Sequence, residues 1–161
     1  MKSKSIRDFI EHVKLQIGEV HQPSSSSDGM KKYVMSNSDC IFTWSVVTGE
    51  MIFRKGFKKL LDVDDQILTL ERYISFIHPD DVEYVKKIGQ AATLESLSRP
   101  EGNEEWMLYV AHRIRKADNS YIRILAQSFP IEFDENGRIT EFLVRLKNIS
   151  FTNWHGIVEY E

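Results

Sequence analysis

Residues 106–150 decide the fold of this chain, and they read WMLYVAHRIRKADNSYIRILAQSFPIEFDENGRITEFLVRLKNIS. Within this stretch, segments 106–116, 121–133 and 138–149 each place apolar residues at every second position. Successive side chains of a β-strand point to opposite faces of a sheet, so this period of two predicts three half-buried strands. The buried face is expected to carry Leu108, Val110, His112, Ile114, Ile122, Ile124, Ala126, Phe142, Val144 and Leu146.

The two connections between these segments have the composition of tight turns. Residues 117–120 read ADNS and residues 134–137 read DENG. Asn and Gly tolerate the positive φ that a hairpin turn requires. Two linked hairpins make a three-stranded meander, whose apolar face must be covered by the part of the chain that precedes it.

Composition narrows the class of protein. A chain of 161 residues suits one domain with extensions. The single cysteine, Cys40, excludes an intrachain disulfide and a cysteine-based zinc site, so we expect a reducing, cytoplasmic setting. No apolar run approaches a membrane span. A net charge of −3 argues against direct nucleic-acid contact by this chain.

The first 32 residues are predicted to form a helix and a linker. Within residues 1–21, apolar side chains recur at spacings of four and three, which is the seam of an amphipathic helix. The seam includes Ile6, Ile10, Val13 and Ile17. Residues 22–32 contain four consecutive serines and Asp28-Gly29, which is linker composition. The helix is expected to pack on its own domain or to pair with a second subunit, and the sequence leaves both open.

The middle of the chain predicts a hairpin followed by helices. Residues 40–46 and 51–54 read as two strands around Thr48-Gly49, and short helical segments follow up to Ile77. A longer helix is expected to begin at Pro79, where a missing N–H costs nothing. Asp80 and Asp81 then place carboxylates at the positive end of that helix.

With this order of elements, the sequence resembles a PAS domain over roughly residues 35–150. The resemblance is carried by His78-Pro79-Asp80-Asp81, by HRIRK at 112–116 with the acidic turn and Tyr121-Ile122 after it, and by KNIS at 147–150. The flanks also resemble the PAS segments that precede a helix-turn-helix in LuxR-type regulators of Bacteroidetes. Two positions depart from the family pattern: Asn119-Ser120 replaces the usual Asp-Gly, and Asn148 replaces an acid that helps to couple the last strand to an effector.

The resemblance implies an α+β fold with a five-stranded antiparallel sheet of order 2-1-5-4-3 and helices on one face, often with a small pocket between. It implies sensing or interaction and not catalysis. We therefore expect a PAS domain over residues 33–150 and a C-terminal exit segment, 151–161, leading toward an effector outside this chain.

His112 is the polar residue that we expect in such a pocket. It lies in register with Val110 and Ile114 and should face the helices, although a hydrogen-bonded core histidine is the alternative. Ser128 lies on the matching face of the next strand. Four aromatic residues are expected nearby: Trp44, Phe53, Tyr73 and Phe142.

The opposite face of the meander is expected to be an interface. Leu125 and Phe129 lie there among Arg113, Arg115 and Arg123. Such a basic and aromatic surface could stack nucleic acid. We favour cover by the N-terminal helix or a second subunit, because the two apolar side chains need burial and acidic residues of the helix could meet the arginines.

Cofactors and catalysis find little support. Flavin-binding relatives carry a cysteine in an Asn-Cys-Arg-Phe motif on a helix, whereas Cys40 starts the first strand and reads as a buried apolar residue. Haem-binding relatives use a histidine on the long helix, and residues 82–97 contain none. Asp80 and Asp81 diverge by about 100° around their helix, so they form no catalytic pair, and no metal site is predicted.

We therefore expect a PAS-type sensing and dimerisation module, the regulatory part of a transcription regulator. A ligand-free interaction scaffold is the main alternative. A small α+β isomerase or hydratase with His112 as its base is the enzymatic alternative, although that fold usually begins with helices and not with a hairpin.

Overall fold

The computed structural model describes residues 40–98 and 106–151. The predicted N-terminal helix, the Ser-rich linker and the exit segment beyond Phe151 lie outside the described residues. In chain order the elements are β1 (Cys40–Ser45), β2 (Met51–Lys55), α3 (Phe57–Leu61), the 3₁₀ helix η1 (Asp65–Ile67), α4 (Leu70–Ser75), α5 (Pro79–Ser98), β3 (Leu108–Arg115), β4 (Tyr121–Phe133) and β5 (Ile139–Asn148).

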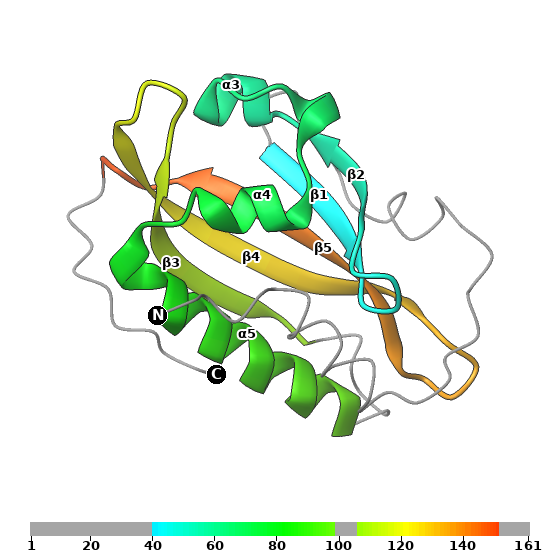
Figure 1. The fold of residues 1–161 in the computed structure, drawn as a ribbon. Helices are drawn as coiled ribbons and strands as arrows, with labels where there is room; N and C mark the ends of the chain where they lie inside the picture. The colour runs from blue at the N-terminus through cyan, green and yellow to red at the C-terminus, as the bar shows by residue number, and fades with distance from the viewer. Residues whose placement is uncertain (1–39, 99–105, 152–161) are drawn as a thin grey trace.

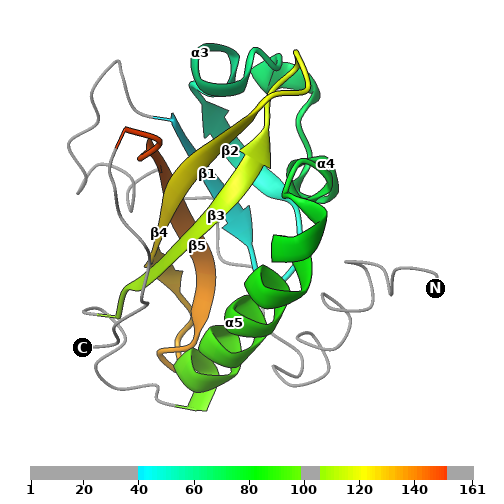
Figure 2. The same cartoon turned by 90° about the vertical axis from the view of Figure 1, so that its left-hand side faces the viewer.

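The five strands form one antiparallel sheet in the order β2-β1-β5-β4-β3 (Figure 1). This order confirms the predicted fold. The meander β3-β4-β5 is the stretch that the alternation of residues 106–150 predicts, and the first hairpin joins it through β1. The described helices all lie on one face of the sheet, which Figure 2 shows edge-on.

The turns of the meander have the predicted backbone. Asn119 has a φ of 65° and Gly137 a φ of 74°. The Lys116 N–H donates to the Ser120 carbonyl at 2.8 Å, which closes the first hairpin. Asn119 therefore fulfils the turn requirement at the place where the family more often has Asp-Gly.

The inner face of the sheet forms the core with α3, η1 and α4. Phe42, Phe57, Leu61 and Leu68 are almost completely buried. Cys40 belongs to the same cluster, and burial raises the pKa of its thiol, so it remains a neutral apolar side chain. This placement confirms the interpretation of Cys40 as a core residue.

Helix α3 depends on a carboxylate from a later element. It has five residues, and its N-cap, Gly56, has no side chain. The Asp65 carboxylate instead accepts hydrogen bonds from the backbone N–H groups of Gly56 at 3.1 Å, Phe57 at 2.7 Å and Lys58 at 3.3 Å. A negative charge at this position satisfies free N–H donors and complements the positive end of the helix. Asp65 thus ties η1 to α3.

Substitution of Asp65 should show how much this remote cap contributes. Asp65→Ala removes three hydrogen bonds to otherwise free donors and is expected to lower the free energy of unfolding by about 2 kcal/mol. Asp64→Ala is the matched control, because within the described residues Asp64 accepts only one hydrogen bond, from the Gln66 N–H. Urea denaturation should separate the two variants, and equal losses would contradict a special role for Asp65.

Candidate functional site

A cavity of about 150 Å³ lies between the inner face of the sheet and helices α4 and α5. Most of its lining is apolar, and aromatic side chains contribute much of the wall. The aromatic residues are Phe42, Trp44, Tyr73, Trp106 and Phe142. Polar side chains enter at His112, Ser128, Thr93 and Lys86. An apolar cavity with few polar groups is the usual form of a small-molecule site.

The cavity brings together five of the six residues that the sequence suggested for ligand contact: Trp44, Tyr73, His112, Ser128 and Phe142. Phe53 is the exception. It pairs with Thr43, which points away from the face that Phe42 and Trp44 share. A register shift between Thr43 and Trp44 changes the pairing of the hairpin, and the alternation pattern gave no sign of it.

Helix α5 contributes wall residues that sequence reasoning missed. Gly89 and Thr93 line the cavity together with Ala92, so the helix presents small side chains there. A Cβ atom placed on Gly89 would meet nothing within 4 Å. The spacing of these small residues on one helical face was the available signal.

Aromatic packing shapes the end of the cavity nearest to Trp106. The Trp44 and Phe142 rings stack with centroids 5.6 Å apart and planes 18° apart. Trp106 approaches Phe142 at 5.6 Å in a tilted arrangement. Such pairs stabilise one another beyond simple burial, so this wall is preorganised to receive another flat ring.

His112 and Tyr73 form the polar part of the wall. Tyr73 Oη lies 3.3 Å from His112 Nε2, and His112 is 3% exposed. Burial lowers the pKa of His112 to about 4, an effect that the Asp81 charge and the Val110 backbone oppose only in part. Burial also raises the pKa of Tyr73. Both side chains are therefore neutral at pH 7, and His112 is both a hydrogen-bonded core residue and a cavity-lining group.

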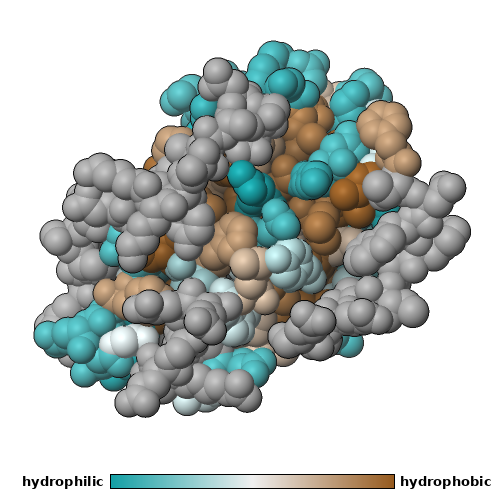
Figure 3. All heavy atoms as spheres, turned by 180° about the vertical axis from the view of Figure 1, so that it is seen from behind, coloured by the Kyte–Doolittle hydropathy of each residue, from teal (hydrophilic) through white to brown (hydrophobic). Residues whose placement is uncertain are grey.

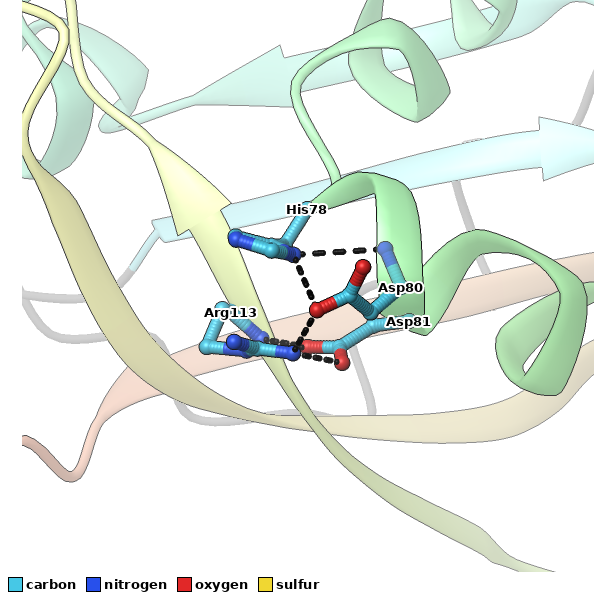
Figure 4. Close-up of polar contacts among 4 residues, drawn as sticks. All are labelled: His78, Asp80, Asp81 and Arg113. Carbon is cyan, nitrogen blue, oxygen red and sulfur yellow. Dashed lines mark hydrogen bonds and ion pairs between the residues drawn. The ribbon is translucent and has the colours of Figure 1, made fainter.

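The start of α5 is attached to β3 by an ion pair (Figure 4). Arg113 Nη2 lies 2.6 Å from Asp81 Oδ1, and Arg113 Nε donates to Asp81 Oδ2 at 3.0 Å. Asp80 is a more distant partner at 3.4 Å. The Asp80 N–H donates to His78 Nδ1 at 3.2 Å, so the His78 side chain caps the start of α5. The hydrogen bonds from Arg113 hold the pKa of Asp81 below its usual range.

Backbone hydrogen bonds strengthen the same junction. The His78 N–H donates to the Arg113 carbonyl at 2.9 Å, and the Arg115 N–H donates to the Phe76 carbonyl at 2.8 Å. Ile77 thereby forms an isolated bridge with Ile114, and Ile77 also lines the cavity. The link between α4 and α5 is thus fixed to the sheet at the point where the cavity begins.

This junction corrects the expected role of Arg113. The sequence suggested that Arg113 meets acidic residues of the N-terminal helix, whereas it binds Asp81, whose carboxylate was assigned only to the helix start. Alternation assigns a strand residue to one face of the sheet. A residue of an edge strand can also reach a helix that packs beside that edge, and alternation does not predict this contact.

The outer face of the sheet, seen in Figure 3, carries the predicted interface residues of β4. Leu125 and Phe129 are both half-buried, and apolar residues reach the visible surface beside hydrophilic ones. The predicted helix residues Ile6, Ile10, Val13 and Ile17 lie outside the described residues. Their contact with this face therefore stays a prediction.

The described residues contain neither a membrane-spanning helix nor a cluster of metal ligands. None of the helices at 40–98 is long and apolar enough to cross a membrane. Across 40–98 and 106–151, no group of three or more His, Cys, Asp or Glu side chains is arranged to hold a metal ion.

Comparison with known proteins identifies the family. A family model of the PAS fold matches residues 51–145, which is more than half of the chain. The chain belongs to the PAS family, whose members are generally sensory modules. No curated protein matches it in sequence.

Solved structures agree on the fold. The N-terminal domain of a diguanylate cyclase with a PAS/PAC sensor from Marinobacter aquaeolei is 15% identical, with a TM-score of 0.59 over 72% of this chain and 99% of that one. The PAS domain of the fruit-fly ELK potassium channel is 17% identical, with a TM-score of 0.57 over 79% of this chain and 99% of the other. Drosophila melanogaster Cycle PAS-B with bound ethylene glycol is 15% identical, with a TM-score of 0.52 over 68% and 99%.

Loss of the Asp81 charge should loosen the junction between α5 and β3. We expect Asp81→Asn to lower the free energy of unfolding by about 1 to 2 kcal/mol, because it weakens charge-assisted hydrogen bonds that are partly exposed. Asp80→Asn is the matched control, since it removes an equal charge from the same helical turn but weakens only longer contacts, to Arg113 at 3.4 Å and to His78 at 3.5 Å. Thermal denaturation should show the smaller effect for Asp80→Asn, and the reverse order would contradict the assignment.

The neutral state of His112 predicts a dependence of stability on pH. The unfolded chain binds a proton at His112 near pH 6.5, whereas the folded chain binds it only near pH 4. Folding stability should therefore fall as the pH drops from 6.5 to 4, by about 3 kcal/mol from this residue alone. In His112→Gln this contribution should vanish, and denaturant midpoints across the interval measure it. Parallel curves for the two proteins would show that burial does not keep His112 neutral.

Proposed function

We propose that this chain is a signal-sensing and dimerisation module in which occupancy of the cavity by a small ligand is the input. The observation that carries the proposal is the half-open apolar cavity with the His112–Tyr73 pair in its wall. A space of this size forfeits packing energy in the unliganded protein, and a ligand that fills it would restore those contacts.

Strand β5 is a suitable route for the output. Phe142 and Val144 contribute to the cavity wall, and the same strand continues to Asn148. Beyond it, the Ile149 N–H donates to the Arg123 carbonyl at 2.8 Å. A ligand that moves the β5 side chains therefore acts on the strand that leads into the exit segment, 151–161.

The relatives support a sensory role of this kind. One similar structure is the N-terminal domain of a diguanylate cyclase with a PAS/PAC sensor, and Cycle PAS-B was solved with bound ethylene glycol, a small neutral molecule. On the resemblance of the flanks, we propose that the natural effector is the helix-turn-helix of a LuxR-type transcription regulator acting in the cytoplasm. A ligand-free scaffold that works only through protein contacts is the second candidate, favoured by the half-buried apolar residues on the outer face.

We propose no catalytic activity for the cavity. A general base near pH 7 needs a pKa close to that value. Burial lowers the pKa of His112 to about 4 and raises that of its partner Tyr73. The pair is suited to hold a hydrogen-bonding group and not to exchange protons with a substrate.

The outer face of β4 is proposed as the surface that pairs two copies, directly or through the N-terminal helices. Native mass spectrometry of the 161-residue chain is expected to show a dimer, and Phe129→Asp should yield monomers because it buries a charge in that interface. Ile52→Asp is the control, since Ile52 is 57% exposed and lies on edge strand β2. A wild-type monomer would exclude pairing.

The same spectra distinguish a ligand sensor from a ligand-free scaffold. A small-molecule adduct that is lost on denaturation would support the sensor.

A further inference from the structure

The cavity that the proposed function uses is also specific enough to indicate its ligand. We propose that it binds a neutral, single-ring aromatic compound with one hydroxyl group, of about the size of phenol. The ring would lie against the stacked Trp44 and Phe142 side chains, and the hydroxyl would meet the His112–Tyr73 pair. This inference rests on the proposed function and names the ligand class of the same site.

Volume limits the ligand to one ring. Apolar cavities of about 150 Å³ hold a benzene molecule, and the cavity here has about that volume. Aromatic residues from β1, β5, α4 and the segment before β3 surround the space, and their faces and edges favour a flat aromatic ring over an aliphatic chain.

The polar atoms in the wall favour a hydroxyl group. Tyr73 Oη and His112 Nε2 share one rather long hydrogen bond of 3.3 Å. His112 Nδ1, fully buried, makes no well-formed hydrogen bond within the described residues. A ligand hydroxyl both donates and accepts, so it can bind to this pair whichever way the tyrosine proton points. Burial of a polar group is costly unless the group is hydrogen-bonded. A ligand hydroxyl beside this pair therefore binds more favourably than a hydroxyl against the apolar part of the wall.

The charges around the cavity favour a neutral ligand. His112 is itself kept neutral by burial, and an ionised ligand would pay the same desolvation cost. Among the described residues of the wall, Lys86 is the one cation. Its ammonium group lies 4.0 Å from the exposed Glu83 carboxylate, so its aliphatic part lines the cavity while its charge is already directed outward.

Isothermal titration of the full 161-residue chain with phenol, benzene and benzoate tests the inference. We expect phenol to bind about five to ten times more tightly than benzene, which is the gain from one hydrogen bond. Benzoate should bind more weakly than phenol because its charge must be buried. The double variant Tyr73→Phe/His112→Leu removes both polar atoms of the pair and should reduce the phenol preference to about onefold. Ser128→Ala, the matched removal of another wall hydroxyl, should retain most of it.

Gly89→Leu supplies a variant that does not depend on the polar pair. Its side chain would enter the open space beside α5 and should abolish binding of all three probes, while Gly89→Ala should retain binding. Circular dichroism would show that each variant remains folded, and NMR shifts of the Trp44 and Trp106 indole N–H groups should report phenol binding in the wild-type protein.

The other outcomes overturn the inference in distinguishable ways. Equal binding of phenol and benzene would remove the hydrogen-bonding role and leave an apolar ligand site. If benzoate binds more tightly than phenol, and this preference is lost in Lys86→Gln, the ligand class would be an aromatic acid and not a neutral compound. Both results would leave the sensory function standing. Failure of all three probes would overturn the ligand class, and the adduct seen or missing in native mass spectrometry would then decide the function separately.

Discussion

The attachment of the helical layer to the edge of the sheet is the constraint on which the rest of this structure depends. The link before α5 adds itself to β3 through two backbone hydrogen bonds, and the Asp81–Arg113 ion pair reinforces the same point. A charge-assisted bidentate contact fixes direction as well as distance. Because α5 begins at this junction and runs for 20 residues, an anchored first turn sets the path of the whole helix over the sheet. The space between α5 and the strands follows from that path.

The dense core and the cavity adjoin each other and share wall residues such as Phe42 and Tyr73. Near α3 and η1 the core is closely packed, with Phe57, Leu61 and Leu68 showing no exposure. Beside α5 the wall includes small residues such as Gly89, and the space between the layers is not filled. A cavity forfeits dispersion contacts, and a buried polar pair adds a desolvation cost. The dense core offsets both costs, which allows the domain to keep a site.

Local patterns in the sequence predicted most of the fold and part of the site. Alternation of apolar residues is a property of single strands, so it could predict the meander, the inner face of the meander and the position of His112 on that face. Features set by tertiary contact did not follow. Phe53 was misplaced because a register shift changes the hairpin, and the cap of α3 by Asp65 joins residues from separate elements. Arg113 was assigned correctly to a strand, but its partner Asp81 comes from a helix that only the folded edge brings near.

The end of β5 shows how a signal could leave the domain without an ion pair. Asn148 stands where relatives often carry an acid, and its amide oxygen accepts the Ser150 N–H at 2.9 Å. The Ser150 hydroxyl in turn accepts the Arg123 N–H at 3.0 Å, which holds the end of the strand to β4. These bonds are neutral, so salt screens them little. If the cavity is the input of the domain, its occupancy acts through Phe142 and Val144 on the backbone of this same strand. The closure at Asn148 then passes on a displacement of the strand and not a change in charge, which fits a ligand that carries no charge itself.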